Sequence, residues 1–129
     1  MKMEDIISIL TKFKHIHSII LFGSRAKGTQ KEKSDFDLCI IPDPDVSISL
    51  KERIALENSL PENIDLSLID ELPVNIRKRV FLEGKVLYTT DLYYILTLAK
   101  RTDMEYVKYR NLKRDYHKAV MNRVSAKLR

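Results

Sequence analysis

Short apolar runs alternate with amphipathic stretches along the first ninety residues of this chain. The runs are rich in isoleucine, leucine and valine and predict strands at residues 16–22, 36–41, 64–69 and 86–88. Apolar residues that recur every three or four positions predict helices over residues 4–13, 50–60, 73–83 and about 91–127. The pattern indicates an α/β (α+β) fold, with a small mixed β-sheet flanked by helices and a long C-terminal helix.

Proline and glycine support several of these boundaries. Pro42 and Pro44 interrupt the second strand, and Pro61 ends the helix that precedes the third. Pro73 suits the first turn of the next helix, and Gly84 is a natural stop for it.

The last thirty residues differ from the rest in charge. Residues 1–99 carry a net charge of −2, whereas residues 100–129 carry +7. Such a segment is either a helix with a solvated basic face or a surface for an acidic partner or nucleic acid. An apolar stripe at helical spacing runs along the segment: Tyr109, Leu112, Tyr116, Val120 and Val124. We expect Tyr106, Tyr109 and Tyr116 to pack in a core, with a protein interface as the alternative.

Length and composition fit one domain over residues 1–129, with a mass of 15.1 kDa. No apolar stretch reaches the roughly 18 residues that span a membrane, and the acidic N-terminus is unlike a signal peptide, so we expect a cytoplasmic protein. The single cysteine, Cys39, excludes an intrachain disulfide. The histidines lack metal-ligand spacing and are expected at surface or boundary positions: His15, His17 and His117.

The candidate chemistry is concentrated in residues 21–38. An apolar run ends in Gly23-Ser24, and Asp35 and Asp37 follow about ten residues later. Residues two apart on a strand point to one face, so the two aspartates would project together while Phe36 and Leu38 enter the core. Carboxylate oxygens suit Mg²⁺, and a glycine turn lets the backbone approach phosphate closely.

Three further residues complete the predicted site. Asp65 lies in an apolar run, where an ionised carboxylate is costly unless it is paired or metal-bound, so we expect it beside the other two aspartates. Arg25 and Lys27 place positive charge next to the turn. The P-loop pattern is absent.

The segments around GSRAKG, SDFDL, IDLSLIDELP and RKRVFLEGKVLY resemble the DNA polymerase β-like nucleotidyltransferase superfamily, and its minimal nucleotidyltransferase (MNT) branch in particular. The resemblance covers about residues 16–90, the catalytic core, and more loosely the helical segment from about 91 to 127. It implies that Gly23 and Ser24 hold the nucleotide phosphates, and that Asp35, Asp37 and Asp65 bind two Mg²⁺ ions and carry the catalysis.

Several MNT proteins are antitoxins paired with HEPT-type toxins. For them, the resemblance implies transfer of AMP from ATP to a tyrosine of the toxin, which silences a ribonuclease. The alternative is a non-catalytic antitoxin that neutralises its partner by contact through the C-terminal helix. We do not expect direct nucleic-acid binding, because the basic segment has no recognised RNA-binding motif.

Overall fold

The computed structural model describes residues 2–23, 26, 28 and 35–128. Four strands form one sheet in the order β3-β2-β1-β4. Their bounds are Ile16–Phe22 for β1, Phe36–Pro42 for β2, Ile64–Leu68 for β3 and Lys85–Thr89 for β4. β1 is antiparallel to β2 and β4, whereas β2 and β3 are parallel, so the predicted mixed sheet is confirmed.

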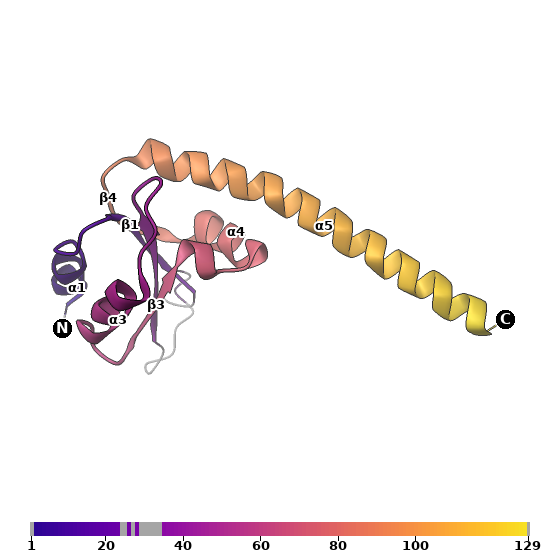
Figure 1. Cartoon of the computed structure of the whole chain (residues 1–129), viewed down its shortest axis with the longest axis horizontal. Coiled ribbons are helices and arrows are strands. Elements are labelled where there is room, and N and C mark those ends of the chain that lie inside the picture. The colour runs from indigo at the N-terminus through magenta and orange to yellow at the C-terminus, as the bar shows by residue number, and fades with distance from the viewer. Residues whose placement is uncertain (1, 24–25, 27, 29–34, 129) are drawn as a thin grey trace.

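Helices cover both faces of this sheet (Figure 1). On one face lie α1 (Met3–Leu10) and α3 (Leu50–Asn58), in contact with Ile19 and Leu38. On the other face lie α4 (Val74–Glu83) and the start of α5, which cover Ile20 and Cys39. Side chains on both faces of the central strands are therefore buried, which is why β1 and β2 read as continuous apolar runs.

Most predicted boundaries are shifted by only a few residues. α1 ends at Leu10, before the positive φ of 71° at His15 redirects the chain into β1. α3 begins after Ser49, whose hydroxyl accepts a hydrogen bond from the Glu52 amide, as an N-cap does. β3 gives way to a short 3-10 helix, η1 (Ile69–Glu71), one residue earlier than predicted.

The α4–β4 junction shows why a glycine ends α4. Pro73 precedes the helix instead of lying in its first turn, and Gly84 is the C-cap. Gly84 has an ordinary extended backbone, so its conformation does not require a glycine. The lack of a side chain does, because a Cβ there would collide with the Val80 carbonyl and the Ile20 side chain. β4 can therefore pass directly from α4 onto the edge of β1.

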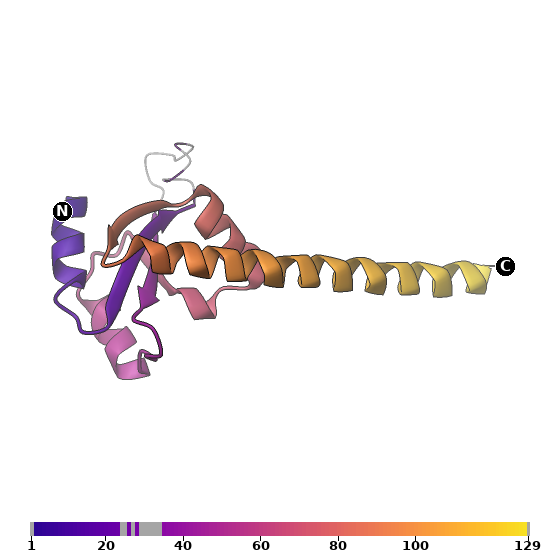
Figure 2. The same ribbon diagram turned by 90° about the horizontal axis from the view of Figure 1, so that it is seen from above.

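α5 (Leu92–Leu128) is 37 residues long, or about 55 Å, and projects well beyond the sheet (Figures 1 and 2). Its first half packs on α4 through buried Ile95 and Thr102 and through ion pairs, with Arg77–Glu105 at 2.9 Å and Lys78–Asp103 at 3.1 Å. In the part of the chain that the structure describes, no helix has the length and apolarity to cross a membrane.

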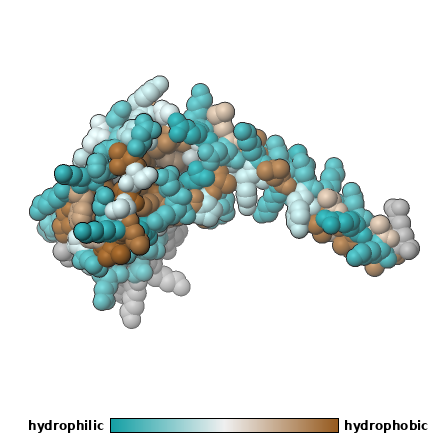
Figure 3. All heavy atoms as spheres, viewed as in Figure 1, coloured by the Kyte–Doolittle hydropathy of each residue, from teal (hydrophilic) through white to brown (hydrophobic). Residues whose placement is uncertain are grey.

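The distal part of α5 contradicts one prediction. Tyr109 and Tyr116 were expected to pack in a core, but they are 38% and 70% exposed, and Leu112 between them is 70% exposed. Apolar side chains are visible along this end of the helix in Figure 3. The helix has left the body at this point, so its periodicity has no surface of this chain to pack against.

His17 is a second correction. It was expected at the surface or a boundary but is 4% exposed, with Nδ1 2.6 Å from the Ser18 hydroxyl and its ring edge-on to Tyr94. A bulge between Ile16 and Ser18 changes the register of β1 at this point, and α5 covers the site. His15 and His117 are exposed, as expected.

Candidate active site

Asp37 and Asp65 lie side by side on neighbouring strands. In the parallel ladder of β2 and β3 they are direct partners, and Phe22 of β1 is the partner of Asp37 on the other side. These three residues therefore form one row across the sheet. Residues two apart on a strand share a face, so Asp37 points to the same side as Cys39, which packs beneath α4 and α5.

The surroundings of Asp37 disfavour its charged form. Burial is the largest cause that raises the pKa of Asp37, followed by the negative charge of Asp65, a hydrogen bond with Asp65, and the charge of Asp35. Two adjacent carboxylates cannot both ionise cheaply without a nearby cation. The structure thus places Asp37 and Asp65 side by side, and Asp35, exposed just before β2, acts on Asp37 through its charge.

The side chains do not form a ready-made cage around a cation. Among the described residues, no group of three or more histidine, cysteine, aspartate or glutamate side chains is close enough to hold a metal ion. What the fold supplies is a carboxylate pair on adjacent strands, with a third carboxylate two residues before Asp37. Leu38 points into the opposite core and Phe36 packs against it, as predicted.

Gly23 places the turn after β1 directly against this pair. Its φ of +74° lies in the left-handed region, which favours glycine. A Cβ at this position would collide with the carboxylate of Asp37. The glycine therefore allows the backbone to approach the carboxylates closely, and its role beside phosphate stays a prediction. Ser24, Arg25 and Lys27 lie outside the described residues, so their phosphate contacts stay predictions.

A small cavity next to Gly23 was not foreseen from the sequence. It has a volume of about 160 Å³ and lies between the end of β1 and α4, where Phe22, Gly23, Ile76, Arg79 and Glu83 line it. The residues from α4 are more than fifty positions away from Gly23, and no motif links them to it. Only the packing of α4 on this face of the sheet reveals their proximity.

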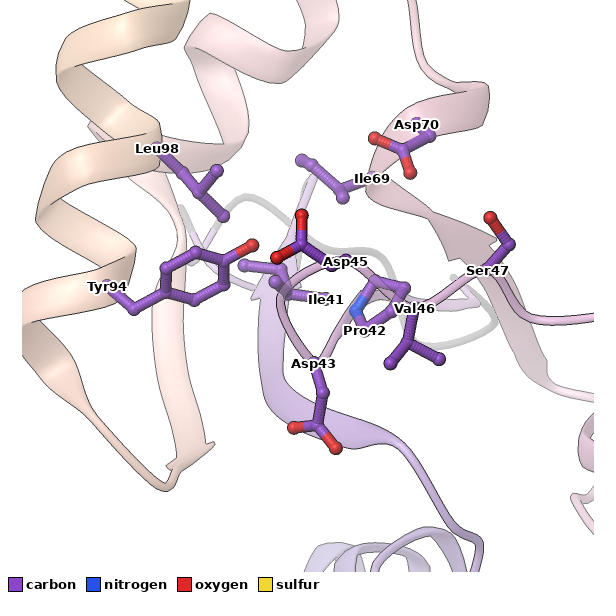
Figure 4. A pocket seen from close by; sticks show the side chains of 10 residues that line it. All are labelled: Ile41, Pro42, Asp43, Asp45, Val46, Ser47, Ile69, Asp70, Tyr94 and Leu98. Carbon is purple, nitrogen blue, oxygen red and sulfur yellow. The ribbon is translucent and has the colours of Figure 1, made fainter.

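A second cavity lies at the opposite end of β2 (Figure 4). It has a volume of about 360 Å³, and its lining includes Asp43, Asp45, Asp70, Tyr94 and Leu98. Burial raises the pKa of Tyr94; the charge of Arg101 opposes this, and the three aspartates add to it. This acidic cavity is separated from Asp37 by the length of β2 and plays no part in the chemistry below.

Comparisons with known proteins identify the family of this chain. A family model described as "Polymerase beta, Nucleotidyltransferase" matches residues 4–93. A relative from Methanocaldococcus jannaschii, named "Putative protein adenylyltransferase", is 24% identical over 105 residues, which are 81% of this chain and 75% of the relative.

Solved structures share the fold. A chain in the crystal structure of a toxin–antitoxin complex with AMP-PNP has a TM-score of 0.77 and 23% identity, covering 94% of this chain and 99% of that one. A chain in the complex of a tri-AMPylated Shewanella oneidensis HEPN toxin with its MNT antitoxin has a TM-score of 0.69 and 20% identity, covering 92% and 94%. At these identities the likeness concerns architecture.

The family match covers far more than half of the chain and spans every strand of the sheet together with α1, α3 and α4. It includes both carboxylates of the β2–β3 pair and the turn at Gly23. The chain therefore belongs to the polymerase beta nucleotidyltransferase family.

Proposed function

We propose that this chain is a Mg²⁺-dependent protein adenylyltransferase of the MNT type. It transfers AMP from ATP to a tyrosine hydroxyl of a HEPT-type toxin, and it acts in the cytoplasm as the antitoxin. The observation that carries the proposal is the pairing of Asp37 with Asp65 next to the left-handed turn at Gly23. Neighbouring carboxylates can hold the metal ions that assist transfer of a phosphoryl group, and a glycine turn leaves room for the backbone to approach a phosphate.

The residues present fit magnesium. Their donors are hard carboxylate oxygens, and the charge of Asp65 raises the pKa of Asp37, so a cation bound between them would relieve the repulsion of the two ionised groups. Asp35, Asp37 and Asp65 would together hold two ions. When bound, Mg²⁺ neutralises charge on the triphosphate and increases the acidity of the acceptor hydroxyl.

The chain's own groups then have separate tasks. The Gly23 turn brings the backbone to the phosphates, and Ser24, Arg25 and Lys27 would balance the charge of the departing pyrophosphate. The acceptor oxygen forms a bond to the α-phosphorus as the bond from that phosphorus to the pyrophosphate oxygen breaks. The hydroxyl proton passes to a carboxylate, for which Asp65 is our candidate.

The comparisons support the choice of AMP and of a protein acceptor. The archaeal relative is named as a protein adenylyltransferase, and one structural neighbour was crystallised with an ATP analogue. Another contains a HEPN toxin that carries AMP groups, in complex with its MNT antitoxin.

The test is to mix the purified chain with the protein encoded beside it in the presence of Mg²⁺ and ATP, and to measure the intact mass of that protein. We expect a gain of one or more AMP units with the native chain, and none with Asp35→Asn or Asp37→Asn. Asp43→Asn is the matched control, because it removes the same charge at the far end of β2. Transfer by the Asp37→Asn variant would contradict the assignment.

A second candidate function rests on α5. The exposed apolar stripe on its distal half, including Leu112 and Tyr116, suits a contact with a partner protein. The chain would then neutralise the toxin by binding alone. Full neutralisation by the Asp37→Asn variant, without any mass gain on the toxin, would favour this function over AMP transfer.

A further inference from the structure

A basic cavity of about 340 Å³ lies between α4 and α5. Lys78 and Arg79 reach it from α4, and Tyr106, Tyr109 and Lys113 reach it from α5. Neither the predicted site nor the proposed transfer step uses these residues. The cavity exists only because α5 crosses α4, held by the Arg77–Glu105 and Lys78–Asp103 ion pairs.

This cavity adjoins the active site. Arg79 and Glu83 line it and also line the smaller cavity next to Phe22 and Gly23. A ligand could therefore extend from the Asp37–Asp65 pair, past Gly23 and Arg79, into the space between the two helices. Arg79 stands at the junction of the two cavities.

The lining combines three cationic side chains and two aromatic rings with one carboxylate, that of Glu83. Tyr106 and Tyr109 have ring centroids 6.2 Å apart, and the Lys78 ammonium lies 4.8 Å from the centroid of Tyr106 while it also contacts Asp103. Lys78 thus fixes Tyr106 in place. Among the described side chains, Arg79 and Lys113 form no ion pair, so both cations are available to an anion.

We propose that the α4–α5 cavity binds a nucleotide unit, with its phosphate on Arg79 and Lys113 and its base against Tyr109. Bases stack on aromatic rings, and guanidinium and ammonium groups bind phosphate. The volume is of the size expected for one small ligand. An isolated nucleotide fits this single hollow better than a long nucleic acid, which would contact the cations along the whole of α5.

We infer that the nucleotide in this cavity is an adenylate that an earlier transfer has already joined to the acceptor. This identification of the ligand rests on the proposed function. Held in the cavity, the adenylate would present a ribose hydroxyl to the carboxylates for another transfer. The ribose oxygen would bond to the α-phosphorus of a new ATP, pyrophosphate would leave, and the hydroxyl proton would pass to a carboxylate. The same chemistry would fit the adenosine of the substrate ATP itself, so the experiment must separate the two sources.

Calorimetric titration with AMP separates them when the chain is first saturated with Mg²⁺ and AMP-PNP. We expect AMP still to bind, because the cavity is distinct from the triphosphate site. Lys113→Glu should weaken this binding about tenfold or more, and Arg79→Ala should also weaken it. Lys127→Glu makes the same charge change far along the helix and should alter the affinity less than twofold. Circular dichroism checks that α5 is intact in each variant.

Several outcomes would overturn the inference. Competition between AMP and AMP-PNP would assign the cavity to substrate ATP, and equal losses in the Lys113→Glu and Lys127→Glu variants would show non-specific attraction. A 15-residue oligoadenylate that binds far more tightly than AMP, with equal sensitivity to both variants, would indicate an RNA surface. Because these are binding measurements, a chain that binds AMP through Lys113 but transfers none would refute the proposed function and leave the cavity assignment standing.

Discussion

Asp37 and Asp65 are direct partners across the only parallel strand pair of the described sheet, and the charge of Asp65 helps to raise the pKa of Asp37. Because β2 and β3 run in the same direction with this register, two carboxylates that are 28 positions apart in the chain lie next to each other on one face of the sheet. A shift of one residue in this register would turn Asp65 to the opposite core. The register of β2 and β3 therefore determines whether the two carboxylates meet.

The first prediction concerns the pH dependence of stability. Since the pKa of Asp37 is raised in the folded state, Asp37 favours the fold most at pH below the unfolded value of about 4, and this contribution is lost as pH rises through the raised pKa. In EDTA at pH 7 to 8 we expect Asp37→Asn to melt a few degrees higher than the native chain, and the difference to shrink toward pH 4. Thermal unfolding across this range measures it.

Added Mg²⁺ provides the control for that prediction. The ion should raise the melting temperature of the native chain at neutral pH and have little effect on the Asn variant, which has lost one anionic ligand. If the Asn variant melts at a lower temperature than the native chain at pH 8 in EDTA, the ionised Asp37 side chain does not destabilise the fold, and the prediction is wrong.

The second prediction compares two glycines. Gly23 and Gly28 have nearly equal positive φ, +74° and +73°, but a Cβ on Gly23 would strike the Asp37 carboxylate, whereas a Cβ on Gly28 meets nothing within 4 Å. Each alanine should cost about 1–2 kcal/mol of folding free energy because of the backbone strain, and the collision with Asp37 should add to the cost at Gly23. Gly23→Ala should in addition abolish nucleotidyl transfer. Urea unfolding and an AMP-transfer assay separate the two effects, and equal activity in both variants would show that the close approach at Gly23 has no role.

The third prediction concerns the distal end of α5. Leu112 and Tyr116 are largely exposed, so this end adds little to the stability of the body. Deletion of residues 115–129 should leave the melting temperature within about 2 °C of the native value, since no core contact is lost. A larger drop would show that this end folds back on the body or packs on another copy, and sedimentation of both chains would tell these cases apart.

The fourth prediction concerns the single cysteine. Cys39 is fully buried on β2 beneath α4 and α5. Burial is the main cause that raises the pKa of its thiol, and the charges of Asp70 and Glu71 add to it. A protonated, enclosed thiol reacts slowly with alkylating agents. Iodoacetamide should leave the native chain unmodified by mass and should label it fully in 6 M guanidinium chloride. Rapid labelling of the native chain would show that α4 opens readily from the sheet.

Local patterns in the sequence determined much of this protein. The apolar runs gave all four strands to within one or two residues, because β1 and β2 are buried on both faces and need apolar side chains throughout. Gly84 indicated the end of α4. The two-residue spacing of Asp35 and Asp37 predicted that both side chains point to one face of a strand. Each of these signals depends on residues that are close together along the chain.

Only the tertiary structure decided what depends on distant contacts. The β2–β3 register places Asp65 opposite Asp37. His17 lies at a bulge in β1 and is buried, whereas Tyr116 lies on the part of α5 that projects into solvent. The helical period of α5 would look the same against a core as in solvent, because periodicity specifies a face and not what covers it. The basic cavity between α4 and α5 likewise has no local signature, since Arg79 and Lys113 meet only through the crossing of two helices.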